Sequence, residues 1–129
     1  MPYSPLGRGF LTGQITRRAD LPEGDYRLRD PRYSEENFAQ NLKIVDVVRA
    51  IGEAHGVSPA QIALAWLLAQ GPDVVPIPGS KRRTTLEDSM AAVDVVLSAD
   101  DLARLDAAAP RGGTAGPRYG EQQMAAVKR

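Results

Sequence analysis

The segment from Ser58 to Ala69 constrains the fold of this chain more than any other part of its sequence. Its first four residues, Ser-Pro-Ala-Gln, combine an N-cap serine, a proline at the first helical position and a glutamine three residues after the cap, which predicts a helix with a capping box. Every residue from Ile62 to Ala69 is apolar. A helix that is apolar nearly all round is buried on more than one side. Neighbouring elements must therefore cover this one, Trp66 is expected in the core, and Gly71-Pro72 ends the helix.

The spacing of apolar residues predicts a longer helix from about Glu35 to His55, ahead of this segment. Ser34 is its expected N-cap, and Gly56 is placed to stop it in a left-handed conformation. His55 falls at its C-terminus, where the helix dipole favours a partly charged imidazole. The apolar stripe of this helix consists of Phe38, Leu42, Val45, Val48 and Ile51.

Two further helices are expected after the buried one. The first begins near Thr84, which has Glu87 three residues on, and the second is capped by Ser98. Their expected inward-facing residues are Leu86, Met90 and Val93 in the first and Leu102 and Leu105 in the second.

The remaining segments are expected as strands, a loop and a tail. The β-branched run at 74–78 predicts a short buried strand, although its prolines cannot donate to a ladder. If residues 1–5 end another strand, the order βαβα implies parallel strands with crossover helices. Residues 13–33 are polar and predict a long surface loop, which makes them a candidate binding loop. After Pro110 the chain becomes glycine-rich, with a last helical turn expected near Gln122–Val127.

Composition excludes several classes of chemistry. The chain has 129 residues, and at ~100–200 residues per domain it holds one domain at most. Its 16 basic and 16 acidic side chains balance, so nucleic acid and membrane surfaces are not expected partners. Without cysteine there are no disulfides, Cys-ligated zinc or thiolate nucleophiles, and one histidine does not make a multi-His metal site. A cytoplasmic location is expected, since neither a signal peptide nor a membrane span is visible.

The turn from Gly79 to Arg83 is a candidate phosphate site. A glycine after a buried strand lets the backbone approach a ligand closely, and the next helix presents free N–H groups and the positive end of its dipole. Lys81, Arg82 and Arg83 add positive charge to this turn. The alternative is that these cations form a solvated patch.

A second glycine-containing turn, Ser4-Pro5-Leu6-Gly7-Arg8-Gly9, precedes the loop. Its glycines could expose backbone N–H groups to a phosphate, but it lacks the three-glycine dinucleotide fingerprint. A plain turn is the alternative.

Taken together, four ordered motifs resemble the last third of an aldo/keto reductase, over essentially the whole chain. The motifs are Tyr3-Ser4-Pro5-Leu6-Gly7-Arg8-Gly9-Phe10-Leu11-Thr12-Gly13, Arg32-Tyr33-Ser34-Glu35-Glu36-Asn37, Ser58-Pro59-Ala60-Gln61-Ile62-Ala63-Leu64-Ala65-Trp66, and Pro76-Ile77-Pro78-Gly79-Ser80-Lys81-Arg82-Arg83 with Leu86-Glu87-Asp88-Ser89.

The resemblance implies an α/β fold, a partial (β/α)₈ TIM barrel that is mostly helical as an isolated chain. Residues 1–129 would form the C-terminal part of a reductase domain, with strands seven and eight at 1–5 and 74–78. The active site of this architecture lies at the C-terminal ends of the strands. Residues 13–37 and the tail from Pro110 would be substrate loops.

The resemblance also implies an NADPH site, whose residues match the family motifs one by one. Tyr3 would stack on the nicotinamide, and the turn after it would wrap the pyrophosphate. The basic turn would hold the adenosine 2′-phosphate, which favours NADPH over NADH. Asp88 and Ser89 would contact the adenine, although Ser89 stands where the family usually has Asn and offers fewer donors. The expected cofactor residues are Tyr3, Ser4, Leu6, Gly7, Arg8, Gly79, Ser80, Lys81, Arg83, Asp88 and Ser89.

None of these residues is catalytic by the same resemblance. The family uses an Asp, a Tyr, a Lys and a His from its second to fourth strands, and Tyr26, Tyr33 and Tyr119 do not occupy that motif. The complete protein is expected to reduce small aldehydes and ketones with NADPH. The alternatives are a weak cofactor-binding module, an inactive remnant, or an interaction fragment that docks on a barrel partner through exposed barrel edges.

Overall fold

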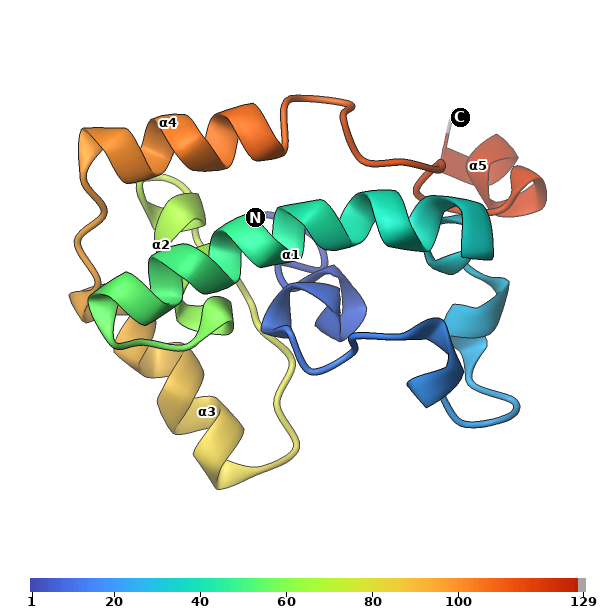
Figure 1. Cartoon of the computed structure of the whole chain (residues 1–129), viewed down its shortest axis with the longest axis horizontal. Helices are drawn as coiled ribbons and strands as arrows, with labels where there is room; N and C mark the ends of the chain where they lie inside the picture. Colours follow the sequence, from blue (N-terminus) through green and yellow to red (C-terminus); the bar gives the residue numbers. More distant parts are fainter. Residues whose placement is uncertain (128–129) are drawn as a thin grey trace.

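The computed structural model describes residues 1–127 and consists of helices joined by turns and extended segments (Figure 1). The long α1 crosses the middle of the molecule, α4 lies above it in this view, α3 lies below it, and α2 passes behind it and contacts both α1 and α3. The α-helices are α1 (Glu35–His55), α2 (Pro59–Leu68), α3 (Arg83–Met90), α4 (Ala99–Ala108) and α5 (Glu121–Val127). None of the described helices is long and apolar enough to cross a membrane.

The predicted capping box of α2 is confirmed. The Gln61 backbone N–H donates to Ser58 Oγ at 3.2 Å, and the Ser58 N–H donates to Gln61 Oε1 at 3.1 Å. Ile62 is fully buried and Leu64 is 1% exposed. α2 packs against α1, α3 and the N-terminal turn, so it is covered on several sides, as its sequence requires.

α1 also begins and ends at its predicted residues. Ser34 Oγ accepts from the Asn37 N–H at 3.3 Å, and Gly56 adopts φ 67°, a left-handed value at which a side chain would be strained. The apolar stripe contributes to two core clusters. One holds Phe38 and Val45 with the N-terminal turn, and the other holds Val48 and Ile51 with residues of α2 and α4.

A polar contact joins the C-terminus of α1 to the N-terminus of α4. His55 Nε2 lies 2.9 Å from Asp101 Oδ2, and the Ser98 N–H donates to the same oxygen at 3.0 Å. Hydrogen bonds from His55 and then from Ser98 lower the pKa of Asp101 to about 2. The predicted cap at Ser98 is confirmed, and the lone histidine has a structural partner.

The two predicted strands are wrong for the described residues. Residues 1–5 and 74–78 are extended segments and turns, and residues 1–127 contain no strand. A strand is stable only when its backbone groups pair with a neighbour, and these two segments do not pair with each other. Pro76 and Pro78 also lack the N–H that a ladder needs. The expected partial barrel is therefore not formed, whereas the expectation of a mostly helical chain is confirmed.

The expected inward face of α3 is also wrong. Leu86 and Met90 are 47% and 62% exposed, because the described residues place no element against this face. Val93 lies beyond the end of α3, in the 3₁₀ helix Ala91–Asp94, and is 70% exposed. α3 begins at Arg83, one residue before Thr84, and its N-cap, Arg82, has no side-chain cap. Trp66 is half-buried, and its indole Nε1 donates to Asp106 Oδ1 at 2.8 Å.

The predicted surface loop at 13–33 is folded onto the N-terminal core cluster through Ile15 and Leu21, which are buried. Short 3₁₀ helices give it shape, because each closes a tight turn in place of a longer helix. The 3₁₀ helices of the chain are Gly7–Thr12, Arg18–Asp20, Tyr26–Arg29, Pro31–Tyr33 and Ala91–Asp94.

Replacing Asp101 by Asn is expected to lower the free energy of unfolding at pH 7 by about 1 kcal/mol, since it weakens the α4 cap and the contact with His55. The depressed pKa means that the carboxylate stabilises the fold above pH ~4 and loses that contribution as pH falls toward about 2. Urea unfolding between pH 2 and 7 measures this effect. The control is Asp100→Asn, on the exposed side of the same turn, and an equal loss in both variants would contradict the role of Asp101.

Candidate functional site

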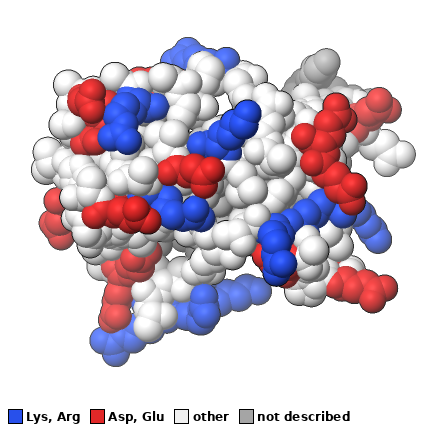
Figure 2. Space-filling view, in the orientation of Figure 1, with Lys and Arg blue, Asp and Glu red and all other residues white. Residues whose placement is uncertain are grey.

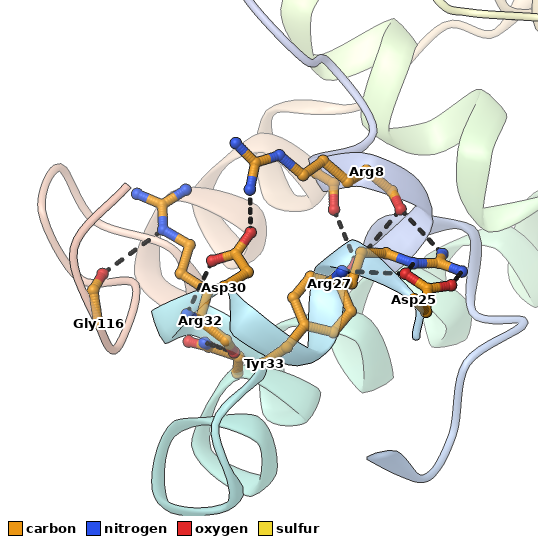
Figure 3. A network of polar contacts seen from close by, with 9 residues as sticks. Arg8, Asp25, Arg27, Asp30, Arg32, Tyr33 and Gly116 are labelled. Carbon is orange, nitrogen blue, oxygen red and sulfur yellow. Dashed lines mark hydrogen bonds and ion pairs between the residues drawn. The ribbon is translucent and has the colours of Figure 1, made fainter. Parts of the chain in front are cut away.

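The N-terminal turn is held in place by an ion pair and a tyrosine hydroxyl (Figure 3). The Arg8 guanidinium pairs with the carboxylate of Asp30, which is buried. The hydroxyl of Tyr33 donates to the Gly7 carbonyl at 3.0 Å and to the Arg8 carbonyl at 3.3 Å. Arg27 Nη1 also donates to the Arg8 carbonyl at 3.2 Å. The loop at 13–33 thus positions the backbone of the turn that was expected to wrap a pyrophosphate.

The backbone of this turn is strained at two residues that are not glycine. Ser4 has φ 53° and Arg8 has φ 59°, both in the left-handed region. Such a conformation costs an L-residue roughly 1–2 kcal/mol. Strain of this kind persists where surrounding contacts fix the backbone, and it clusters at binding and catalytic sites.

Three tyrosine rings and the Arg8 guanidinium form a cluster beside the N-terminal turn. The ring of Tyr3 is 67% exposed and lies 6.3 Å from the ring of Tyr119, centroid to centroid. The Arg8 guanidinium lies 5.3 Å from the Tyr119 ring and 5.9 Å from the Tyr26 ring. Hydrogen bonding by Tyr119 and by Arg8 lowers the pKa of Tyr3. The exposed face of Tyr3 is free of the core and can meet a planar ligand.

An open groove of about 800 Å³ connects the two predicted phosphate turns. The N-terminal turn forms one wall, the extended segment before α3 forms another, and the start of α5 adds to the rim. The predicted site residues that line this groove are Tyr3, Ser4, Leu6, Arg8 and Gly79. Gly7 faces a smaller pocket on the other side of the turn.

The basic turn lies beyond the groove on the exposed edge of the molecule. Ser80, Lys81 and Arg83 are exposed and do not line the groove. Figure 2 shows positively charged side chains at the lower edge, where α3 begins. Arg83 Nε donates to Glu87 Oε1 at 2.7 Å across one helical turn, an exposed pair of small energetic value. Ser80 Oγ donates to the Arg82 carbonyl at 2.9 Å.

The two expected adenine contacts take part in packing between α2 and α3. The carboxylate of Asp88 accepts from Ser58 Oγ at 2.9 Å, and its carbonyl accepts from Gln61 Nε2 at 3.0 Å. Ser89 is buried. The structure therefore assigns Asp88 a contact with the α2 cap, and it does not bring this pair to the groove.

The C-terminal tail is attached to α1 by one asparagine that the sequence did not single out. Asn41 Nδ2 donates to the Ala115 carbonyl at 3.0 Å, and the Ala115 N–H donates to Asn41 Oδ1 at 2.8 Å. Gly116 has φ 84°, and a Cβ there would lie 2.7 Å from Asn37 Nδ2, so only glycine allows this close approach. These contacts bring Arg118 and Tyr119 to the N-terminal turn.

The sequence reasoning also missed Asp30, Arg32 and Arg118, which surround Arg8. Asp30 stands before a proline, as an N-cap does, and its Oδ1 accepts from the Arg32 N–H at 3.0 Å. That local role is visible in the sequence, because acid-Pro is a common helix start. The long-range pairing with Arg8 is not, since it depends on how the loop folds back.

Comparison with known proteins shows the family to which this chain belongs. The model of the aldo/keto reductase family matches residues 1–110. The match includes both glycine turns and all of α1 to α4, in the expected order. The chain belongs to the aldo/keto reductase family.

Curated relatives support the same family. The chain is 46% identical over 91% of its length to a Schizosaccharomyces pombe aldo-keto reductase whose name specifies NADP(+). It is 43% identical over 78% of its length to aldo-keto reductase str7 of Strobilurus tenacellus, and 41% identical over 92% to a protein of Glycine max named as an aldo-keto reductase. These matches cover 34%, 30% and 34% of the relatives, so the chain spans about a third of their length.

Replacing Tyr33 by Phe is expected to lower the free energy of unfolding by about 1 kcal/mol, because the Gly7 and Arg8 carbonyls lose a donor. Burial raises the pKa of Tyr33 to about 12, so the neutral phenol stabilises the fold and this contribution is lost as pH rises from 10 toward 12. Absorbance at alkaline pH should show a tyrosine ionisation at about pH 12 that Tyr33→Phe removes. Tyr26→Phe, at an exposed ring, is the control and should keep that late step.

Proposed function

We propose that this chain forms one wall of an NADPH site and that, in a complete reductase of this family, it serves the reduction of small aldehydes and ketones to alcohols. The observation that carries the proposal is the groove, which joins the Tyr3–Arg8 turn to Gly79. Two turns far apart in sequence are thereby brought to one concave surface. Ligand sites are concave surfaces of this kind, with a few polar groups.

The residues that line the groove fit the nicotinamide and the pyrophosphate of a dinucleotide. The exposed ring of Tyr3 offers a flat surface for the nicotinamide. The Arg8 guanidinium lies in the groove with its charge partly balanced by Asp30, and it suits a pyrophosphate as a bidentate donor. When bound, NADPH supplies the hydride for carbonyl reduction.

The basic turn suits the remaining phosphate. Lys81 and Arg83 are exposed and lie in the sequence between Gly79 and Thr85, which both line the groove. A 2′-phosphate carries two charges that NADH lacks, and charge-assisted hydrogen bonds to such a group contribute about 1.5–3 kcal/mol each. Arg83 would have to exchange its exposed contact with Glu87 for the phosphate, at little cost.

Tyr33 and Tyr3 are not assigned the role of proton donor. Tyr33 is buried, its hydroxyl is held by two carbonyls, and its pKa is raised to about 12, far above the neutral pH at which a general acid works best. Tyr3 is assigned to the cofactor ring. We therefore assign proton transfer to the Asp, Tyr, Lys and His that the family carries on its second to fourth strands.

The joint change Lys81→Ala and Arg83→Ala is expected to weaken NADPH binding about tenfold or more and NADH binding less than twofold. The reason is that both side chains are proposed to meet only the 2′-phosphate. The measurement is a fluorescence titration of each cofactor into a complete reductase that carries this chain.

The matched control removes two exposed cations on other helices, Lys43→Ala with Arg104→Ala. It should leave both affinities within twofold of the parent. Equal losses of NADPH and NADH binding in the Lys81/Arg83 variant would contradict the assignment to the 2′-phosphate.

A further inference from the structure

A second, smaller cavity of about 190 Å³ lies on the other side of the N-terminal turn. It is open on one side and is lined by the turn, Asp30 to Tyr33, α1 and the C-terminal tail, whose Arg118 is exposed. Tyr3, Ser4 and Arg8 line both this cavity and the groove, so the two spaces meet at the residue expected to stack on the nicotinamide.

Positive charge is in excess in this cavity. Arg8, Arg32 and Arg118 line it, together with a single carboxylate, that of Asp30. Both oxygens of that carboxylate are already engaged, Oδ2 by the Arg8 guanidinium and Oδ1 by the Arg32 backbone N–H. Within residues 1–127, no carboxylate pairs with the guanidinium of Arg32 or of Arg118.

The geometry holds these arginines together against their mutual repulsion. In Figure 3 the Arg8 and Arg32 guanidinium groups lie on the same side of Asp30. Arg32 Nε donates to the Gly116 carbonyl at 3.5 Å, and the Asn41 contacts keep the tail, and hence Arg118, close by. Burial first and then repulsion from Arg118 lower the pKa of Arg32. An anion between the two guanidinium groups would relieve both costs.

We propose that Arg32 and Arg118 bind an anionic group, a carboxylate or a phosphate, on the carbonyl substrate. This inference rests on the proposed function, because the substrate carbonyl must lie at the nicotinamide beside Tyr3. Tyr3 lines the same cavity as Arg32 and Arg118, so the preferred substrates are aldehydes or ketones with the anion a few carbons from the carbonyl. Arginine is suited to this role because its planar donors match a carboxylate or phosphate in two parallel hydrogen bonds.

The first experiment compares two aldehydes of equal chain length, 4-oxobutanoate and butanal, in a complete reductase that carries this chain. The parent should prefer the anionic aldehyde in kcat/KM by tenfold or more. Arg118→Gln should lower kcat/KM for 4-oxobutanoate about tenfold and change that for butanal less than twofold. Arg118→Lys, which keeps the charge, should restore part of the loss. Arg111→Gln, an exposed arginine of the same tail outside the cavity, is the matched control and should behave as the parent.

A second comparison distinguishes a substrate anion from the phosphates of the cofactor. The cofactor's own phosphates are the other possible occupant, and they would make Arg118→Gln weaken NADPH binding and lower kcat/KM equally for both aldehydes. That result, or equal kcat/KM of the parent for the two aldehydes, overturns the inference while leaving the proposed reduction in place.

A binding measurement separates the inference from the proposed function. Calorimetric titration of succinate into the 129-residue chain needs neither NADPH nor turnover. Binding that is weakened by salt and lost in Arg118→Gln supports the cavity as an anion site, even where NADPH binding fails. Circular dichroism verifies that the variant keeps its helices, and undiminished succinate binding by a folded Arg118→Gln overturns the inference.

Discussion

Burial of α2 against α1 is the constraint on which the rest of this structure depends. α2 has almost no polar side to present to water, so it is stable only when other elements cover it. α1, α3 and the N-terminal turn do so, and Ile62 and Ile51 are completely buried as a result. Full burial of such side chains contributes about 1.5–3 kcal/mol each. Because the N-terminal turn is one of the covering elements, the same packing that stabilises α2 also fixes the position of Tyr3 and Arg8.

An ion pair and two hydrogen bonds then fix the loop and the C-terminal tail against the N-terminal turn and α1. Asp30 binds Arg8 with one oxygen and caps the Pro31–Tyr33 helix with the other, and so links the N-terminal turn to the loop. Asn41 attaches the tail to α1, which carries Arg118 to the same place. The outcome is a wall with more guanidinium groups than carboxylates, suited to anionic ligands. The same excess of positive charge underlies both proposals, the cofactor phosphates in the groove and the substrate anion in the smaller cavity.

The accuracy of sequence reasoning differed between local and distant features. The caps at Ser34, Ser58 and Ser98 were predicted correctly, because a cap depends on a side chain and a backbone N–H only three residues apart. The strand at 74–78 and the inward face of α3 were predicted wrongly, because both assume a neighbour that the described residues do not provide. Trp66 packs against the second core cluster, as expected, but the sequence did not predict that its indole Nε1 also donates to Asp106 on α4.

The sequence by itself determined α1, α2 and α4 with their serine caps, and membership of the aldo/keto reductase family, because these depend on short-range hydrogen bonds and on ordered motifs. It also predicted which two turns would bind phosphate groups, and that prediction enters the proposed function. Only the tertiary structure decided that Tyr3, Arg8 and Gly79 share a groove, that Asp88 serves the α2 cap, and that Arg32 and Arg118 flank one cavity. The physical reason is that such contacts join residues tens of positions apart, and only the path of the whole chain specifies which of them meet.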